Sequence, residues 1–279
     1  MDWKGREQSQ NVEDRRSSSG GGGGGRTPGI LGIIVVLIGA YYGVDLSGLV
    51  GTPSMGTGST QTSQLKPQEE AELNELARVV LADTEKAWGS YFKQIGRTYT
   101  PTTLVLYNGG TSTACGMGQS AMGPFYCPGD QKVYLDLDFY RDMQTKLNSA
   151  SDAAFAYVIA HEVGHHVQNL LGILPKVHRM QQQVGKKEAN ALSVKLELQA
   201  DCYAGIWGHY AVNNNIFKPE DIPKAMLAAE SVGDDRLQKD GQGYVVPDSF
   251  THGSSEQRMA WLKRGLDSGD INQCNTFGN

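Results

Sequence analysis

Residues 160–166 place two histidines and a glutamate at the spacing of a metal-binding helix. His161, Glu162 and His165 form the pattern H-E-x-x-H. On an α-helix, His161 and His165 lie one turn apart and project from the same face. Two imidazoles in this arrangement can bind one Zn²⁺, and Glu162 would lie beside its open coordination position as a base. The pattern therefore predicts a helix that carries a zinc site.

The residues around this pattern predict a single helix over 152–171. Ser149 and Ser151 are suitable N-caps, and Gly172 is a suitable stop. Apolar residues recur at helical spacing, at Phe155, Val158, Ile159 and Leu170. Gly164 costs the helix about 1 kcal/mol relative to alanine, so we expect another backbone to pass close to it. The alternative is an amphipathic helix whose histidines face solvent, but such a helix needs neither the glutamate nor the spacing.

A second long helix, over 187–210, supplies a candidate third ligand. It carries Glu197 and Asp201, one turn apart on one face. A catalytic zinc site of two histidines and one glutamate keeps its fourth position for water, so Glu197 is predicted to complete the ligand set. Asp201 would accept a hydrogen bond from the non-ligating nitrogen of a ligand histidine. A solvated acidic pair is the alternative, but the neighbouring residues are apolar: Leu196, Leu198, Ala200 and Cys202.

The N-terminal part of the chain differs from ordinary globular sequence. Residues 1–29 are polar and include a run of six glycines, so we expect a disordered tail. Residues 30–50 begin with a 15-residue apolar stretch, which is too short by itself for a membrane-spanning helix. With the following residues up to 50 included, the segment reaches the required length of about 20 residues. We interpret them as an uncleaved single-pass anchor, with a cleaved signal peptide as the alternative. Residues 51–65 are interpreted as a flexible linker, and residues 66–279 are long enough for one domain with a full core.

The charge distribution predicts the orientation of this anchor. Arg15, Arg16 and Arg26 precede the apolar stretch, and the next basic residue is Lys66. The positive-inside rule then places the N-terminus in the cytoplasm and the domain on the outer side of the membrane. The net charge of −5, without a basic patch, gives no support to nucleic-acid binding.

Four cysteines follow the predicted anchor. An even number in an exported domain suggests two disulfides, for which three connectivities are possible. We favour Cys115–Cys127, across a glycine-rich turn, and Cys202–Cys274, which would join the C-terminal segment to the second helix. A zinc site that uses cysteine is disfavoured because no C-x-x-C pair occurs, and four buried free thiols are the remaining alternative.

The rest of the domain predicts an α+β fold, mainly helical with a small antiparallel or mixed sheet. A helix is expected over 69–91 and strands over 102–107 and 132–140, the second with alternating apolar residues. Helices over 225–232 and 254–266 are interpreted as packing elements.

These motifs together resemble known metallopeptidases. His161-Glu162-x-x-His165 followed by Glu197-x-x-x-Asp201 is similar to the gluzincin arrangement of thermolysin-like enzymes. The sequence beyond these two motifs resembles the bacterial neutral zinc metallopeptidase family. This resemblance extends from about residue 65 to the C-terminus and includes the layout of the N-terminal anchor. It is carried by Cys127-Pro128-Gly129-Asp130, Val133-Tyr134-Leu135-Asp136, residues 160–168, residues 197–205, His252-Gly253-Ser254 and Gln257-Arg258. The resemblance implies a zincin-like domain and a peptide or protein substrate at a bacterial cytoplasmic membrane, with the domain periplasmic or extracellular.

The resemblance also implies two further elements of the site. An edge strand, for which 132–140 is the candidate, would pair with an extended substrate; a plain core strand is the alternative. His252 resembles a histidine that follows the ligands in the sequence of membrane-associated gluzincins and assists the metal. Arg258 resembles an arginine that comes late in the same sequences. The alternative for His252 is a surface or capping residue, which a lone histidine more often is. His166, His178 and His209 are interpreted as structural or surface residues.

The predicted reaction is hydrolysis of a peptide bond. Zinc held by His161, His165 and Glu197 would activate a water molecule, and Glu162 would accept its proton and pass it to the leaving amine. The alternative from another functional class is a non-catalytic peptide-binding adaptor that retains the zinc fold. The intact base Glu162 favours the enzyme. Hydrolysis of a bond other than a peptide bond also stays open, because the motif alone does not specify the substrate.

Overall fold

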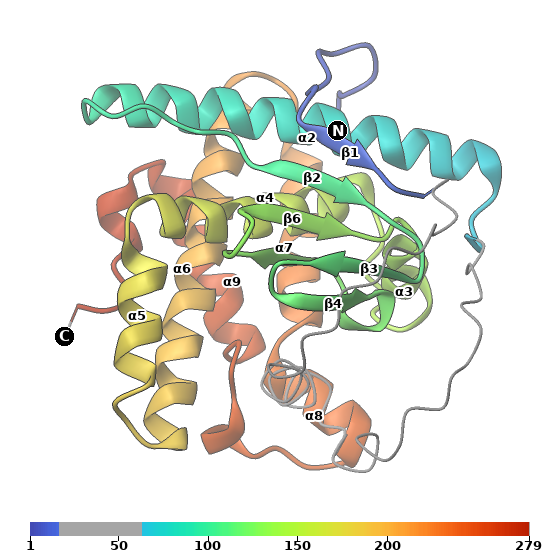
Figure 1. Ribbon diagram of the computed structural model, residues 1–279. Helices are drawn as coiled ribbons and strands as arrows, with labels where there is room; N and C mark the ends of the chain where they lie inside the picture. Colours follow the sequence, from blue (N-terminus) through green and yellow to red (C-terminus); the bar gives the residue numbers. More distant parts are fainter. Residues whose placement is uncertain (17–62, 279) are drawn as a thin grey trace, which may run out of the picture.

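The structure, a computed structural model, describes residues 1–16 and 63–278 (Figure 1). The described part is mainly helical and includes a small mixed sheet, as the sequence predicted. The long helices are α2 (Pro67–Gln94), α4 (Asp152–Leu170), α6 (Lys186–Asn213) and α9 (Ser255–Ser268). The shorter helices are α3 (Phe139–Thr145), α5 (Ile173–Gln181), α7 (Ile222–Ser231) and α8 (Asp234–Gln242).

The sheet is assembled from segments that are far apart in the sequence. Its order is β1-β2-β6-β5, with β1 parallel to β2, β2 parallel to β6, and β5 antiparallel to β6. These strands are β1 (Val12–Asp14), β2 (Thr103–Leu106), β5 (Phe125–Cys127) and β6 (Lys132–Leu135). A separate hairpin is formed by β3 (Gly110–Thr113) and β4 (Gly116–Gln119).

The motif helix α4 lies in the interior between the sheet and the other helices. It packs against α2, α6 and α7 and also contacts β5 and β6. Its backbone lies close to that of α6 at Gly164, where an added Cβ would lie 3.0 Å from the carbonyl oxygen of Ala200. The expected close approach at Gly164 is therefore confirmed, and the glycine allows the two ligand-bearing helices to pack together.

The first sixteen residues are part of the folded domain. Trp3 is only 4 % exposed and donates from Nε1 to Asp152 at 2.8 Å, at the first turn of α4. The N-terminal amine lies 3.0 Å from the Asp221 carboxylate, and β1 forms one edge of the sheet beside β2. The prediction of a disordered tail over 1–29 is therefore wrong for residues 1–16. Their partners lie about 90 to 220 residues away in sequence, so no local pattern revealed them.

This pairing bears on the predicted anchor. Residues 17–62, which include the anchor over 30–50 and most of the linker over 51–65, lie outside the described residues. Within residues 1–16 and 63–278, none of the helices combines the length and the apolar character that crossing a bilayer requires. Because β1 and β2 must lie on the same side of any membrane to pair, a cytoplasmic N-terminus does not fit together with an exported domain.

The predicted strand over 132–140 is shorter than expected and does not lie at the edge. It ends at Leu135, and the chain turns where the Asp136 carboxylate accepts the N–H groups of Gly109 and Asp138. Helix α3 then begins at Phe139. The strand β6 pairs on both sides, with β2 and with β5, so its backbone groups are already used. The edge strand near α4 is β5 instead.

Both favoured disulfides are present. Cys115–Cys127 joins the β3–β4 turn to β5, with Cα atoms 5.9 Å apart. Cys202–Cys274 joins α6 to the C-terminal segment, with Cα atoms 5.6 Å apart. All four cysteines of the chain lie in the described residues and none is left free, so the alternatives of free thiols and a cysteine zinc site do not apply.

Candidate metal centre

Helix α4 positions three of the predicted site residues. Its N-cap is Ser151, whose side chain accepts the N–H of Ala154, and it ends before Gly172, which has φ +77°. Over this span His161 and His165 share one face, with ring centroids 4.8 Å apart. Glu162 is next to them and only 8 % exposed.

The second long helix brings Glu197 against both imidazoles. Nε2 of His161 lies 3.0 Å from Oε2 of Glu197, and Nε2 of His165 lies 3.4 Å from Oε1. One donor atom from each of the three residues lies within 4.8 Å of the other two, so one ion can contact all of them. Two imidazole nitrogens and one carboxylate are the donors of a catalytic zinc site. The structure therefore brings together the three residues that the sequence selected as ligands.

The two histidines have their other ring nitrogens occupied, which fits a metal at Nε2. Nδ1 of His161 lies 2.8 Å from Asp201, as predicted for that carboxylate. Nδ1 of His165 lies 2.9 Å from Oε1 of Gln168, a partner that the sequence reasoning missed. The signal was available, because Gln168 lies three residues after His165 on the same helix. Both contacts leave Nε2 of each ring directed at Glu197.

Asp201 is the centre of a buried polar cluster. It accepts hydrogen bonds from Tyr157 at 2.6 Å and from Arg258 at 2.8 and 3.0 Å, in addition to His161. Burial by itself would raise the pKa of Asp201, but the Arg258 guanidinium and His161 lower it to about 2. Asp201 is therefore ionised at neutral pH and can orient His161. The late arginine that the resemblance implied thus contacts this carboxylate.

Glu162 has the environment of a general base. It lies beside the ligands, and burial raises the pKa of its carboxyl above the ordinary value. A higher pKa makes a carboxylate a better proton acceptor near neutral pH. Glu162 also lines the cleft described below, so a substrate there would meet it.

His252 lies at the same cleft, on the turn before α9. The Asp234 carboxylate holds this turn, because its Oδ2 accepts the N–H groups of Thr251, His252 and Gly253 at 2.9, 2.7 and 3.0 Å. The other oxygen, Oδ1, lies 3.4 Å from Nδ1 of His252. Asp234 is buried and was not selected from the sequence. It lies 18 residues before His252, and the fold brings the two together where α8 packs against α9.

A cleft of about 250 Å³ opens over the centre. It is lined by the ligands, by Glu162, His252 and Arg258, and by residues of the β5 region. The apolar part of its wall consists of Met122, Pro124, Phe125, Phe139, Val158 and Val232. The cleft can therefore receive a chain with apolar side chains beside the candidate metal position.

The remaining histidines have structural surroundings, in agreement with the sequence interpretation. His166 joins α4 to β5, with Nδ1 3.0 Å from the Tyr126 hydroxyl and Nε2 2.7 Å from the carbonyl oxygen of Thr100. Burial lowers the pKa of His166, which favours the neutral ring. His209 contacts the carbonyl oxygen of Leu266 at 2.9 Å. His178 lies on α5, outside the ligand cluster.

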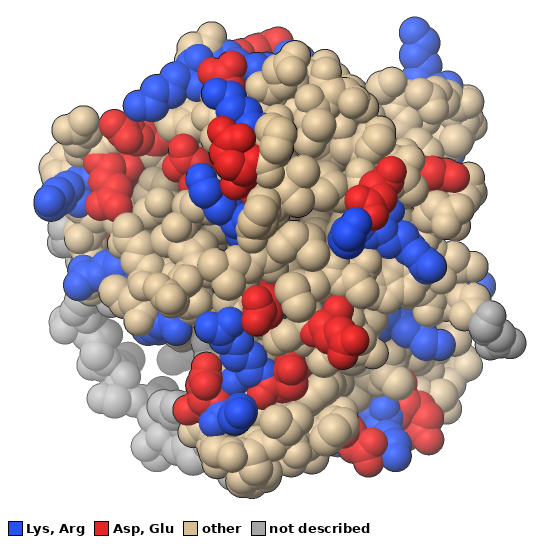
Figure 2. Space-filling view, turned by 180° about the vertical axis from the view of Figure 1, so that it is seen from behind, with Lys and Arg blue, Asp and Glu red and all other residues tan. Residues whose placement is uncertain are grey.

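The surface carries charged side chains of both signs. On the face shown in Figure 2, basic and acidic side chains are interspersed rather than separated into fields of one sign.

Comparisons with known proteins agree with this centre. The family model described as "Putative neutral zinc metallopeptidase" matches residues 1–277. The uncharacterised protein YpfJ of Escherichia coli is 54 % identical over 287 aligned positions, covering 100 % of this chain and 99 % of that protein. The uncharacterised proteins Mb2605 of Mycobacterium bovis and Rv2575 of Mycobacterium tuberculosis are each 40 % identical, covering 74 % of this chain and 73 % of their own. No solved structure matches the chain. The match over nearly the whole length, first sixteen residues included, shows that the chain belongs to this family of neutral zinc metallopeptidases.

Proposed function

We propose that the protein is a zinc-dependent endopeptidase of the gluzincin type. The observation that carries the proposal is the convergence of two Nε2 atoms and the Glu197 carboxylate beside Glu162 in an open cleft. Three protein ligands leave one position of a tetrahedral zinc site for water. An adaptor that only bound peptides would have no use for a buried carboxylate next to that position, so the arrangement favours catalysis.

Each site residue then has a defined task. When bound, zinc supplies a Lewis acid that activates a water molecule and polarises the scissile carbonyl. Glu162 accepts the proton of the attacking water and delivers it to the leaving amine. His252, held by Asp234, donates a hydrogen bond to the carbonyl oxygen as it becomes negatively charged. Asp201 and Arg258 keep His161 in its ligating orientation.

The substrate is proposed to bind as an extended peptide along β5. This strand is at the edge of the sheet and has β6 on one side only. His166 and Asn169 of α4 hold Tyr126 of β5 at 3.0 Å each, so the edge strand is fixed beside the motif helix. Strand addition reads the backbone of a substrate, and the apolar wall of the cleft selects apolar side chains near the scissile bond.

We also propose that the folded domain is exported and lies at the outer face of a bacterial cytoplasmic membrane. The two disulfides support this placement, because such bonds persist in oxidising compartments. In this proposal, residues 1–16 lie on the same side of the membrane as the rest of the domain, because β1 pairs with β2.

The test is a comparison of the wild type with Glu162→Gln on a mixture of unstructured peptides, with cleavage products identified by mass spectrometry. We expect the wild type to cut next to apolar residues when supplied with zinc. The variant should bind the same amount of zinc and produce no fragments above background. The exposed substitution Glu188→Gln on α6 is the matched control. Fragments from the Glu162→Gln protein at the rate of wild type would reject the mechanism.

A further inference from the structure

The second histidine ligand is held by a buried glutamine rather than by a carboxylate. Gln168 is completely buried, and its Oε1 lies 2.9 Å from Nδ1 of His165. His161, in contrast, has the charged Asp201 at its Nδ1. A neutral amide orients an imidazole only if the amide itself is fixed, because either end of the group can otherwise face the ring.

A backbone carbonyl fixes this amide. Nε2 of Gln168 lies 2.8 Å from the carbonyl oxygen of Leu196 on α6, which can only accept a hydrogen bond. The nitrogen must therefore face α6, and the oxygen must face His165. Since that oxygen accepts, Nδ1 of His165 must carry the proton, and its Nε2 presents a lone pair towards Glu197. The Leu196 carbonyl thus selects the tautomer that a metal at Nε2 requires.

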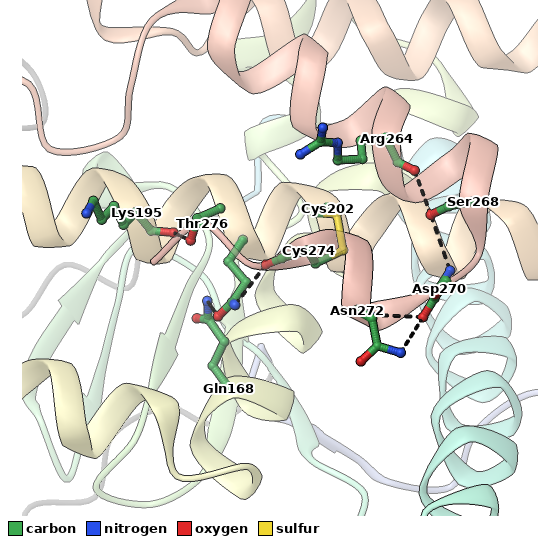
Figure 3. Close-up of a disulfide and its surroundings, with 10 residues drawn as sticks. Gln168, Lys195, Cys202, Arg264, Ser268, Asp270, Asn272, Cys274 and Thr276 are labelled. Atoms are coloured by element: carbon green, nitrogen blue, oxygen red, sulfur yellow. Dashed lines mark hydrogen bonds between the residues drawn. A yellow bond between two sulfur atoms is a disulfide. The ribbon is translucent and has the colours of Figure 1, made fainter. Parts of the chain in front are cut away.

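The chain of contacts continues to the C-terminal disulfide. Nε2 of Gln168 also donates to Oε1 of Gln199 at 3.0 Å, and Nε2 of Gln199 donates to the carbonyl oxygen of Cys274 at 2.9 Å. Gln199 is only 5 % exposed. Cys274 is held in place by its disulfide to Cys202 on α6 (Figure 3). A second anchor follows, because Thr276 donates to the carbonyl oxygen of Lys195 at 2.6 Å.

We propose that Gln168 and Gln199 are positioning residues for the ligand His165, and that the Cys202–Cys274 disulfide anchors them. The inference rests on the proposed zinc site and adds to it a requirement for the C-terminal segment. The contacts of Gln168 with Leu196 and Gln199, and of Gln199 with Cys274, are buried, so a break in one of them leaves an amide without its partner beside the next. An intact disulfide then keeps the Cys274 carbonyl where Gln199 needs it, and zinc affinity depends on a bond outside the cleft.

The first test measures the dissociation constant for zinc by competition with a chromophoric chelator, without any assay of turnover. We expect Gln168→Met to weaken zinc binding by about 10- to 100-fold, the usual effect of removing a partner of a ligand histidine. The matched control is Gln181→Met, because Gln181 also donates to a carbonyl of α6, that of Ala189 at 3.0 Å, but contacts no ligand. Equal affinity of the Gln168→Met and Gln181→Met proteins would overturn the proposal.

The second test addresses the disulfide. The pair Cys202→Ala with Cys274→Ala removes the bond without creating a free thiol that could bind zinc, and we expect about tenfold weaker binding, the lower end of the same range. The control pair Cys115→Ala with Cys127→Ala removes the other disulfide and should keep the wild-type affinity. Wild-type zinc affinity after loss of the Cys202–Cys274 bond would show that the disulfide does not anchor Gln168 and Gln199. Should this pair fail to fold, Gln199→Met tests the link between Gln168 and the Cys274 carbonyl with the bond intact, and wild-type zinc affinity of this variant would overturn the role of the C-terminal segment.

A third measurement separates positioning from general stability. In zinc-bound protein, long-range ¹H–¹⁵N correlation spectra report which nitrogen of His165 carries the proton. We expect Nδ1–H in the wild type and a mixture of tautomers in Gln168→Met, whereas a purely structural role would leave the tautomer unchanged. If the wild type itself bound no zinc, the proposed function would fail as well. If Gln168→Met bound zinc with wild-type affinity while His165→Ala lost it, the zinc site would stand and only the positioning role of Gln168 would be rejected.

Discussion

Arg258 donates two hydrogen bonds to Asp201, from Nε at 2.8 Å and from Nη2 at 3.0 Å, and both side chains are buried. The pair joins α9 to α6, while Asp201 in turn orients His161. The late arginine therefore acts on the candidate zinc site through a carboxylate. Its removal would leave Asp201 ionised in the interior with fewer partners.

We expect Arg258→Met to destabilise the zinc-free protein by about 3–5 kcal/mol, the usual cost of leaving one partner of a buried ion pair alone. The free energy of unfolding in urea measures this. Arg264→Met is the matched control, because Arg264 lies on the same helix and is exposed. The double variant with Asp201→Asn should be less destabilised than the sum of the single variants. Strictly additive losses would contradict a direct coupling of the two residues.

The ligand set makes a separate prediction. His161→Ala, His165→Ala and Glu197→Ala should each lose bound zinc, because two remaining donors hold the ion far less tightly than three. Glu162→Gln should keep one zinc per chain, since Glu162 is outside the ligand cluster. Elemental analysis of the purified proteins decides between these outcomes. A full complement of zinc in Glu197→Ala would remove Glu197 from the ligand set.

His252 is expected to act on the reaction and not on the metal. A hydrogen bond to a developing oxyanion contributes on the order of 10²–10³ in kcat, so His252→Ala should lower kcat by that factor with little change in KM. Zinc content should stay at the wild-type level. His178→Ala is the control from outside the ligand cluster. Loss of zinc from His252→Ala would instead make His252 a ligand.

Asp234→Asn should reproduce part of this defect. The amide keeps one oxygen for the N–H groups of residues 251–253, but the negative charge beside the imidazole of His252 is lost. We expect kcat to fall by less than in His252→Ala, and the double variant to be no worse than His252→Ala alone. Independent, multiplicative losses in a double-mutant cycle would show that Asp234 does not act through His252.

The position of β1 predicts which side of a membrane the N-terminus occupies. The substitutions Gln10→Cys and Ser268→Cys, each at an exposed position, can be labelled one at a time in intact cells with a membrane-impermeant maleimide. Because β1 and β2 pair, the two positions should give the same result before permeabilisation. Labelling of one position and protection of the other would mean that residues 1–16 do not pair with the domain in the cell.

The ion pairs of β1 predict a dependence on pH. Hydrogen bonds from Arg15 at 2.7 Å and Lys132 at 2.8 Å lower the pKa of Glu13 to about 2. A carboxylate whose pKa is lower in the folded state stabilises the fold above its unfolded pKa, about 4.3, and this contribution is lost as the pH falls towards 2. Glu13 is 42 % exposed, so solvent screening limits the contribution to about 1 kcal/mol or less.

The stability difference between wild type and Glu13→Gln should therefore be largest near neutral pH and decrease between about pH 4 and pH 2. Urea unfolding at several pH values measures it. A difference that stayed constant across this range would show that the ion pairs of Glu13 do not stabilise the docked strand.

The sequence by itself determined the elements whose pattern is local. The helices that carry His161, His165 and Glu197 were predicted from caps and apolar spacing, and Asp201 from its position one turn after Glu197. The close approach at Gly164 and both disulfides were also expected. Each of these inferences used residues within a few turns of one another, or a count of a rare residue type.

Tertiary structure decided the partners that lie far apart in the sequence. It placed β1 beside β2, put β5 rather than 132–140 at the sheet edge, and joined Asp234 to His252 and Gln199 to Cys274. Three-residue strands carry too little periodicity to be recognised, and a buried glutamine or aspartate has no signature until its acceptor or donor is known. Local spacing encodes which face of a helix a side chain occupies, whereas the group that meets that face is set by packing of distant segments.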